Sequence, residues 1–210
     1  MAKLLLATSN HGKVREYMML FQGLPYEFTT LEEQGMASVS EVGQSLEENA
    51  RLKAVTCAGQ SKLLTLADDS GLEVDALGGE PGVLSARYAG EGASDSGRIT
   101  YLLSRLKDVP WPERQARFRC VIAIATPDGE VEFCSGECRG FITFEPRGAL
   151  GFGYDPLFYF SEMDKTMAEL PLEIKNQVGH RGQAARKAYP VLARLAGSKY
   201  TSRLDRKETA

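Results

Sequence analysis

The sequence predicts an α/β fold, because short apolar segments expected to be strands alternate with longer segments whose apolar residues recur at helical spacing. The pattern begins with an expected strand from Lys3 to Ala7 and an expected helix from about Lys13 to Phe21. Later in the chain, Arg117 to Ala125 and Glu130 to Glu137 flank Pro127-Asp128-Gly129, which is typical of a β-hairpin. The length of 210 residues suits one compact domain or a two-lobed one.

The helices are predicted from their caps and apolar faces. Ser45 and Glu48 have the spacing of a capping box, which indicates a helix start. Asp95 to Leu106 predicts a buried helix, and Gly182 to Leu195 predicts a terminal helix in which Pro190 is a candidate interruption. The first helix is expected to bury Val14, Tyr17, Met18 and Phe21. The capped helix is expected to bury Leu46, Ala50, Ala54, Cys57 and Ala58, and the third helix Ile99, Leu102, Leu103 and Leu106.

The remaining segments complete the predicted domain. A short strand is expected around Leu157 to Phe160, and Gly140 to Phe144 is a candidate extension of the hairpin sheet. We expect residues 1 to 197 to form a single domain and residues 198 to 210 to form a polar tail.

Two adjacent carboxylates, Asp68 and Asp69, follow an apolar run from Leu63 to Ala67 and precede Ser70-Gly71. The run predicts a buried strand that ends at the two acids, where metal or water can reach them. Because side chains alternate along a strand, the two acids are expected to point to different places. The alternative is a turn that only ends the strand, since Asp, Ser and Gly all favour turns.

Composition excludes several classes of protein. The formal net charge of -3 argues against a protein that wraps nucleic acid through a broad basic face. No apolar run approaches the roughly 18 residues needed to span a bilayer, so a cytoplasmic location without membrane contact is expected. The four cysteines are too few for a disulfide scaffold, and Cys134 and Cys138 lack a second ligand pair for zinc.

The segment Thr8-Ser9-Asn10-His11-Gly12-Lys13 lies between the first expected strand and helix, where backbone N–H groups favour an anion. It is not a standard P-loop, because Ala7 and Val14 stand where that motif needs Gly and Ser or Thr. Two interpretations remain: a different phosphate loop that uses the Thr8 hydroxyl and the Lys13 ammonium, or a plain helix cap.

Other segments supply further ligand-binding groups. Glu41, with Asp69, offers the oxygen ligands that magnesium prefers, although a lone loop Glu is usually solvated. Gly151-Phe152-Gly153-Tyr154-Asp155-Pro156 can stack a ring on a planar ligand, or it can be a turn that buries its aromatic residues. Lys175 and His180-Arg181 add donors near the last helix, or form an exposed basic helix end. Together these groups are the parts of a nucleotide site.

Seven motifs follow one another along the chain. They are Thr8-Ser9-Asn10-x-Gly12-Lys13, Ser45-x-Glu47-Glu48-Asn49-Ala50, Ala67-Asp68-Asp69-Ser70-Gly71-Leu72, Gly78-Gly79-x-Pro81-Gly82, Ser85-Ala86-Arg87-Tyr88, Gly151-Phe152-Gly153-Tyr154-Asp155-Pro156 and His180-Arg181-Gly182. In order and spacing they resemble the inosine triphosphate pyrophosphatase family, whose members act on non-canonical purine nucleoside triphosphates. The likeness runs from about Lys3 to Leu195, and the order of the motifs is more specific than any one of them.

The resemblance implies a two-lobed α/β homodimer, built on a central twisted mixed sheet flanked by helices, with the nucleotide in the cleft between the lobes. It implies Mg²⁺ as cofactor and hydrolysis of ITP, dITP and XTP to the monophosphate and pyrophosphate. It also implies residue roles. Asp69, helped by Asp68, activates water; Glu41 and Asp69 hold the metal; Thr8, Ser9, Asn10, His11, Gly12 and Lys13 contact the triphosphate; and Ser70, Phe152, Gly153, Tyr154, Asp155, Lys175, His180 and Arg181 bind the rest of the substrate. Gly179 departs from the family, in which many members carry Ser.

Two other functions are compatible with parts of the sequence. A phosphatase with an aspartyl nucleophile would need Asp-x-Asp, but the residue two places after Asp68 is Ser70. A nucleotide sensor would keep the phosphate loop and the aromatic loop, yet has no need of paired acids at a metal site. Preference among the substrates and the face used for dimerisation are not specified by the sequence.

Overall fold

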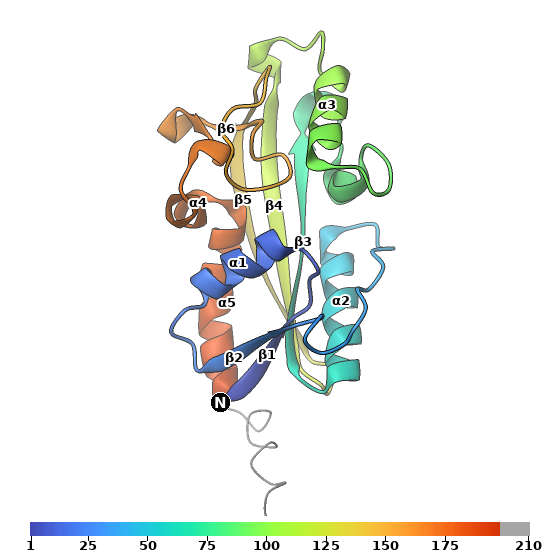
Figure 1. The fold of residues 1–210 in the computed structure, drawn as a ribbon, viewed down its shortest axis with the longest axis vertical. Coiled ribbons are helices and arrows are strands. Elements are labelled where there is room, and N and C mark those ends of the chain that lie inside the picture. Colours follow the sequence, from blue (N-terminus) through green and yellow to red (C-terminus); the bar gives the residue numbers. More distant parts are fainter. Residues whose placement is uncertain (198–210) are drawn as a thin grey trace, which may run out of the picture. The chain divides into compact units, whose positions relative to one another are not determined.

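The structure is a computed structural model that describes residues 1 to 197. Its described part contains a seven-stranded sheet with the order β2-β1-β3-β4-β5-β6-β7 (Figure 1). The strands are β1 (Ala2–Leu6), β2 (Tyr26–Thr30), β3 (Leu64–Val74), β4 (Gln115–Ala125), β5 (Val131–Ile142), β6 (Phe158–Phe160) and β7 (Lys165–Thr166). The sheet is mixed, because β1 pairs in parallel with β2 and β3 whereas β6 pairs antiparallel with β5 and β7. The predicted α/β class is therefore confirmed.

Helices α1 (His11–Leu20), α2 (Leu46–Ser61), α3 (Asp95–Arg105), α4 (Leu172–Val178) and α5 (His180–Ala196) complete the regular structure. The predicted start of α2 is confirmed, because the Ser45 hydroxyl accepts a hydrogen bond from the Glu48 backbone N–H. The Glu48 carboxylate bonds to the backbone N–H of Gln44 rather than that of Ser45. All five residues predicted for the inner stripe of α2 are buried. None of the described helices has the length and apolar character that crossing a membrane requires.

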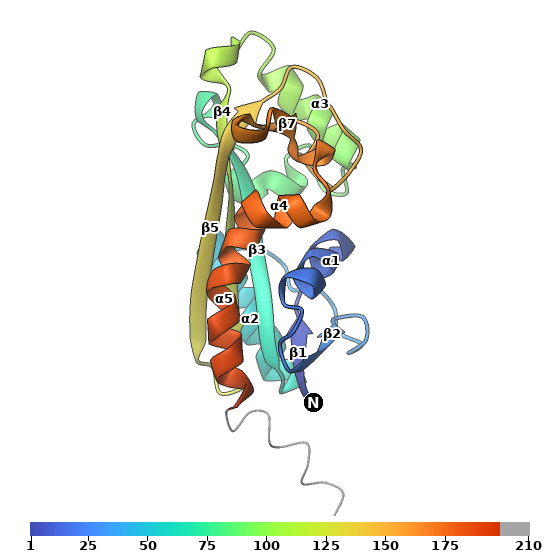
Figure 2. The same ribbon diagram turned by 90° about the vertical axis from the view of Figure 1, so that its left-hand side faces the viewer.

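The described chain divides into two compact units, each with its own buried residues. Unit 1 consists of Met1–Asp69, Val121–Ser135 and Ala184–Ala210, of which the last is described as far as residue 197. Within this unit, α2 and α5 cover opposite sides of the strands (Figure 1). Figure 2 shows α5 alongside β5, where Lys187 Nζ donates to the Ser135 carbonyl at 2.6 Å.

Unit 2 consists of Ser70–Cys120 and Gly136–Gln183. Its apolar core joins the second half of β3, through Leu72 and Val74, to α3, through Leu102 and Leu106.

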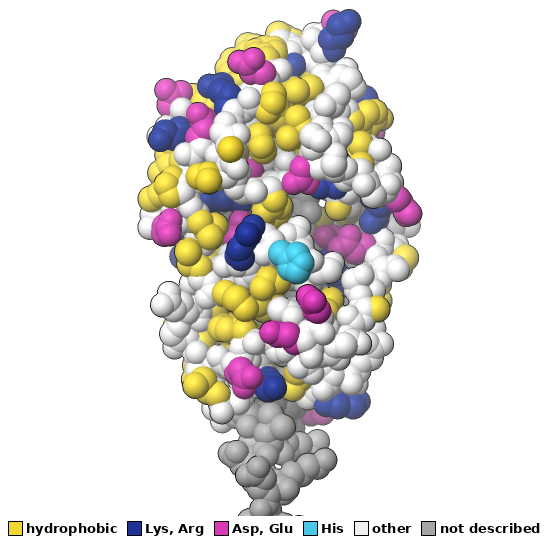
Figure 3. Space-filling view, viewed as in Figure 1, with side chains coloured by type: hydrophobic (Ala, Val, Ile, Leu, Met, Phe, Trp, Pro, Cys, Tyr) yellow, Lys and Arg dark blue, Asp and Glu magenta, His cyan; other side chains and the backbone are white. Residues whose placement is uncertain are grey.

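The prediction of one domain over residues 1 to 197 stays a prediction, and the predicted polar tail lies outside the described residues. On the face drawn in Figure 3, Lys and Arg side chains are interspersed with acidic side chains.

The prediction that the strand ends at Asp68 and Asp69 was wrong. β3 continues through both acids and Gly71 as far as Val74, with Asp68 and Asp69 buried. The alternation of Leu72, Glu73 and Val74 is the continuation of the same strand. Gly71 is not in a turn: a Cβ at this position would lie 2.4 Å from the Gly82 carbonyl oxygen, so the glycine permits close backbone contact.

Other differences concern short or atypical elements. The predictions did not include β2 or α4, which have only 5 and 7 residues. Met18 was expected to be buried, but its position on α1 leaves it 44% exposed. Pro190 does not interrupt α5. Pro190 and Arg186, which lies one helical turn earlier, are both on the exposed side of the helix.

Candidate functional site

The loop that precedes α1 is organised by Asn10. The Asn10 side-chain oxygen accepts hydrogen bonds from the backbone N–H groups of Gly12, at 2.8 Å, and Lys13, at 3.2 Å. The Thr8 hydroxyl accepts from the Asn10 backbone N–H at 3.2 Å, while Ser9 and His11 are exposed. The helix cap foreseen as one interpretation is thus present, and binding of a phosphate to the same loop stays a prediction.

Asp68 connects β3 to this loop. Its Oδ2 atom lies 2.9 Å from Lys13 Nζ, and both side chains are well buried, at 0% and 12% exposed. Holding a carboxylate away from water is costly unless a cation accompanies it. Asp68 therefore fixes the position of the ammonium group that belongs to the loop.

Asp69 contacts α2 instead. Its Oδ2 atom accepts a hydrogen bond from Asn49 Nδ2 at 3.0 Å, and its Oδ1 atom lies 3.7 Å from Lys53 Nζ. Lys53 Nζ is also 2.5 Å from Glu41 Oε1, so the carboxylates of Asp69 and Glu41 approach one ammonium group. The expectation that Asp68 and Asp69 point to different places is confirmed by their different partners.

The buried charges of unit 1 shift the pKa values of Asp69 and Lys53. Burial raises the pKa of Asp69 above its usual value, and Glu41 adds to this, although Lys53, Lys13 and Asn49 act in the opposite direction. Burial alone would lower the pKa of Lys53, but the surrounding carboxylates outweigh it and the pKa is raised. Lys53 is therefore a permanent cation at neutral pH, whereas Asp69 is a carboxylate with a strengthened affinity for a proton.

The oxygen atoms near Lys53 fit a magnesium ion that shares its ligands with a substrate. Among the described residues, no group of three or more His, Cys, Asp or Glu side chains is placed to hold a metal. Mg²⁺, however, is commonly bound by one or two carboxylates while phosphate oxygens and water fill the other positions. Glu41 and Asp69 supply that number of carboxylates, both within reach of a common cation position.

In unit 2, the loop around Phe152 is held by hydrogen bonds between side chains and the backbone. The Phe152 N–H donates to Asp155 Oδ2 at 2.9 Å, and the same oxygen lies 2.5 Å from Lys175 Nζ. Gly151 has φ +77°, and a Cβ there would lie 2.1 Å from Asp155 Oδ2, so glycine is required. The Tyr154 hydroxyl donates to the Ser85 carbonyl at 3.0 Å. The loop is thus a turn in which Tyr154 is buried, as the alternative interpretation expected, whereas Phe152 is only partly buried.

Two cations lie close to the Phe152 ring. Lys175 Nζ is 4.7 Å and Arg181 Cζ is 5.5 Å from the ring centroid. Arg181 Nη2 also donates to the Ser70 hydroxyl at 2.9 Å. An aromatic face with cationic donors beside it can bind a planar group that carries hydrogen-bond acceptors.

His180 and Arg181 begin α5, two residues before the predicted start at about Gly182. Both are buried, and the His180 ring stacks on the Phe118 ring with centroids 4.7 Å apart and an interplanar angle of 17°. The alternative of an exposed basic helix end is therefore wrong for these two residues.

The Ham1 family model matches residues 4 to 191, which is most of the chain. The chain belongs to the Ham1 family. A curated relative from Geobacter sulfurreducens, named dITP/XTP pyrophosphatase, is 53% identical over 88% of this chain and 93% of its own length. A relative of the same name from Bacillus subtilis is 44% identical over 91% of this chain and 98% of its own length.

Solved structures of Ham1 proteins have the same fold. The Coxiella burnetii HAM1 protein matches with a TM-score of 0.84 and 40% identity, over 92% of this chain and 100% of that one. The Staphylococcus aureus Ham1 protein matches with a TM-score of 0.80 and 41% identity, over 90% and 97%. The family resemblance drawn from the seven motifs is therefore confirmed.

In this member of the Ham1 family, the predicted site residues fall into two groups. Unit 1 brings Lys13 to Asp68 and places Glu41 and Asp69 on either side of Lys53. Unit 2 assembles Ser70, Phe152, Asp155, Lys175 and Arg181. The peptide bond between Asp69 and Ser70 joins the two groups covalently.

The sequence reasoning gave no role to two residues of the site, Asn49 and Lys53, which lie one helical turn apart on α2, although Asn49 was part of a motif. A signal was present, because both occupy positions that continue the buried stripe through Leu46 and Ala50. A polar residue on a buried helix face needs a buried partner, and this pair finds it in Asp69.

Proposed function

We propose that this chain hydrolyses non-canonical purine nucleoside triphosphates, namely ITP, dITP and XTP, to the monophosphate and pyrophosphate. In a cell this reaction clears such nucleotides from the pool used for nucleic-acid synthesis. One observation carries the proposal: a chain half identical to relatives named dITP/XTP pyrophosphatase has a buried carboxylate, Asp69, next to a cation and a second carboxylate.

Asp69 is the proposed general base. Its raised pKa gives it the proton affinity that a base needs, and its hydrogen bond with Asn49 fixes one oxygen while leaving the other toward Lys53. In this role Asp69 orients a water molecule and accepts its proton during attack on a phosphorus atom. Asp68 contributes by holding the ammonium of Lys13, which neutralises phosphate charge.

Glu41 and Asp69 are the proposed ligands of Mg²⁺. When bound, the metal neutralises charge on the triphosphate and on the leaving pyrophosphate. Lys53 contacts both carboxylates and so holds the two proposed ligands close together. Residues 8 to 13 are the proposed contacts for the phosphate chain.

The residues of unit 2 are the proposed contacts for the purine. Phe152 stacks on the base, and the Arg181 or His180 donors bond to the keto oxygen at position six, which hypoxanthine and xanthine share. Adenine has an amino group there and would leave such a donor without a bond, at a cost of about 1–3 kcal/mol. The proposed site therefore disfavours ATP more than GTP.

We further propose that the chain works in the cytoplasm as a homodimer. The proposal of a homodimer rests on the family resemblance. Sedimentation analysis of the purified chain tests this proposal: a single species at twice the chain mass supports it, and a monomer at micromolar concentration contradicts it.

Product analysis across a panel of triphosphates tests the proposed reaction. We expect pyrophosphate from ITP, dITP and XTP in the presence of Mg²⁺, much slower release from ATP, and none after chelation of the metal. Release of orthophosphate would instead indicate a phosphatase, and binding without either product would indicate a sensor. Equal turnover of ATP and ITP would contradict the proposed base selection.

A further inference from the structure

The Phe152 loop has a second anchor, from an element far away in the sequence. The Gly153 backbone N–H donates to Asp95 Oδ2 at 2.6 Å, across 58 residues of the chain. Asp95 is the first residue of α3, and Gly153 adopts φ +63°, a conformation that suits glycine. The loop motif from Gly151 to Pro156 does not include Asp95 and does not predict this hydrogen bond.

Asp95 is itself held in place by Arg98. The Arg98 guanidinium forms an ion pair with Asp95 Oδ1 and uses its other terminal nitrogen to donate to two carbonyl oxygens. These are the carbonyls of Ala86, at 2.9 Å, and Ala93, at 2.8 Å. One oxygen of Asp95 is thus fixed by Arg98, and the other is directed to Gly153.

Two consecutive backbone N–H groups of the loop therefore donate to two different carboxylates, one from the loop and one from α3. Asp155, within the loop, accepts from Phe152, and Asp95 accepts from Gly153. The peptide units on both sides of the Phe152 Cα are fixed by these bonds. The direction of the Phe152 ring, which lies near Lys175 and Arg181, depends on that backbone.

We propose that Asp95 is a positioning residue for the purine-binding loop: it fixes Gly153 so that the Phe152 ring is already oriented before the nucleotide binds. This inference rests on the proposed function. A contact that orients a binding surface lowers the cost of binding rather than the barrier of the chemical step. Loss of Asp95 is therefore expected to raise KM and leave kcat nearly unchanged.

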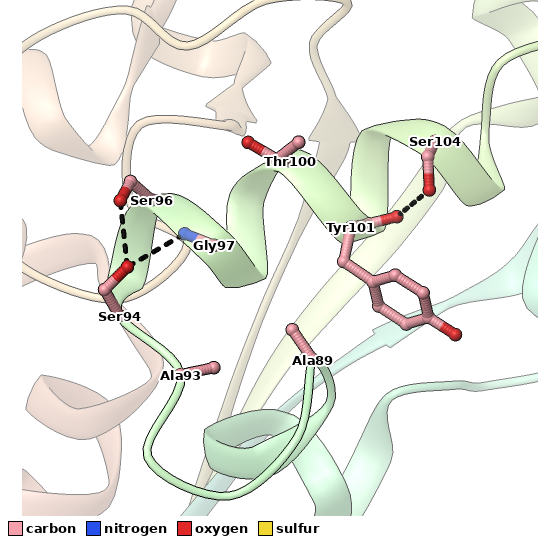
Figure 4. Close-up of a pocket in the computed structure, with 8 residues that line it drawn as sticks. All are labelled: Ala89, Ala93, Ser94, Ser96, Gly97, Thr100, Tyr101 and Ser104. Carbon is pink, nitrogen blue, oxygen red and sulfur yellow. Dashed lines mark hydrogen bonds between the residues drawn. The ribbon is translucent and has the colours of Figure 1, made fainter.

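A purely structural role for Asp95 would act through α3, because an acidic residue in the first turn stabilises a helix. The adjacent Ser94 provides a matched control. Its hydroxyl caps α3 by accepting from the Gly97 N–H at 3.1 Å, and it lines a pocket with Ser96, Thr100 and Tyr101 (Figure 4). Ser94→Ala weakens the same helix without removing the bond to Gly153.

The kinetic test compares Asp95→Ser, Asp95→Asn and Ser94→Ala on dITP. Ser suits a helix start but is too short to reach Gly153, whereas Asn keeps an acceptor oxygen at the same distance. We expect Asp95→Ser to raise KM by about tenfold, the usual effect of one charge-assisted hydrogen bond, with kcat within about threefold of the wild type. Asp95→Asn, which keeps one acceptor oxygen but loses the charge, should recover part of this loss, and Ser94→Ala should leave KM unchanged.

A measurement without nucleotide separates this inference from the proposed function. Hydrogen exchange of the Gly153 amide, followed by NMR, should accelerate in Asp95→Ser and stay slow in Asp95→Asn and Ser94→Ala. An unchanged KM in Asp95→Ser, or an equal rise in Ser94→Ala, would overturn the positioning role. If the wild type releases no pyrophosphate, the proposed function fails, and the dissociation constant of dITP from calorimetry replaces KM in the same comparison.

Discussion

Asp69 is a carboxylate whose surroundings favour its neutral form, and this property suits it to accept a proton. Burial raises its pKa, while Lys53 keeps the ionised form accessible. The same surroundings make the ionised Asp69 side chain destabilising to the folded state. A group whose folded-state pKa is raised stabilises the fold below its unfolded-state pKa, and this contribution is lost as the pH rises through the folded-state pKa.

Replacing Asp69 therefore separates activity from stability. In Asp69→Asn the proton acceptor is lost with little change of shape, so kcat should fall by at least about 100-fold. Because burial makes the ionised carboxylate less favourable in the folded chain than in the unfolded one, the variant should melt at the same temperature as the wild type or higher in the absence of metal. Near-normal turnover in this variant would remove Asp69 from the role of base.

Lys53 sets the pH range in which Asp69 can work. Lys53→Met removes the cation that lowers the pKa of Asp69, so the loss of kcat/KM on acidification should begin at a higher pH than in the wild type. Lys3→Met, which breaks the exposed ion pair with Glu27 at 3.7 Å, serves as the control and should leave the pH profile unchanged. Superimposable profiles for all three proteins would contradict the assignment.

At the scale of elements, β3 supplies Asp68, Asp69 and Ser70 to the candidate site. It remains a strand through both buried acids. At Gly71 the strand comes close to another part of the backbone, because a Cβ at this position would lie 2.4 Å from the Gly82 carbonyl oxygen. Because that atom belongs to the backbone, it cannot move aside as a flexible side chain would.

Alanine at two glycines should have opposite effects. Gly71→Ala should destabilise the fold by about 1–3 kcal/mol through the forced shift of backbone. Gly59→Ala, on α2 with nothing within 4 Å of the added Cβ, should stabilise it by up to about 1 kcal/mol. Urea unfolding measures both, and a neutral Gly71→Ala would show that no close contact exists there.

The elements that sequence predicted well are those whose signals are local. The stripe and Ser45 cap of α2, and the hairpin turn at residues 127 to 129, depend on neighbouring residues alone. The continuation of β3 could not be predicted in this way, because the charges of Asp68 and Asp69 are tolerated through Lys13 and Lys53, which lie elsewhere in the chain. Asn49 and Lys53 were missed for the same reason, since their partner is on another element.

At the scale of the molecule, ligand binding should be visible as stability. A ligand that binds only the folded state raises its free energy of unfolding by about 2.7 kcal/mol at 100 times the dissociation constant. A non-hydrolysable dITP analogue with Mg²⁺ should therefore raise the melting temperature more than the corresponding ATP analogue. In Glu41→Gln the effect of adding Mg²⁺ should shrink, and an undiminished effect would exclude Glu41 as a ligand.

The position of Asp69 and Ser70 as neighbours on β3 has a consequence for how this protein can evolve. Deleting one residue between Leu64 and Ala67 would move the whole acidic pair by one place and exchange the faces on which the two carboxylates project. Lys13 would then face Asp69 instead of Asp68, Lys53 would face Ser70 instead of a carboxylate, and Arg181 would lose its hydroxyl partner at the same time. Natural length variation is therefore expected in the loops of this chain and not within this strand.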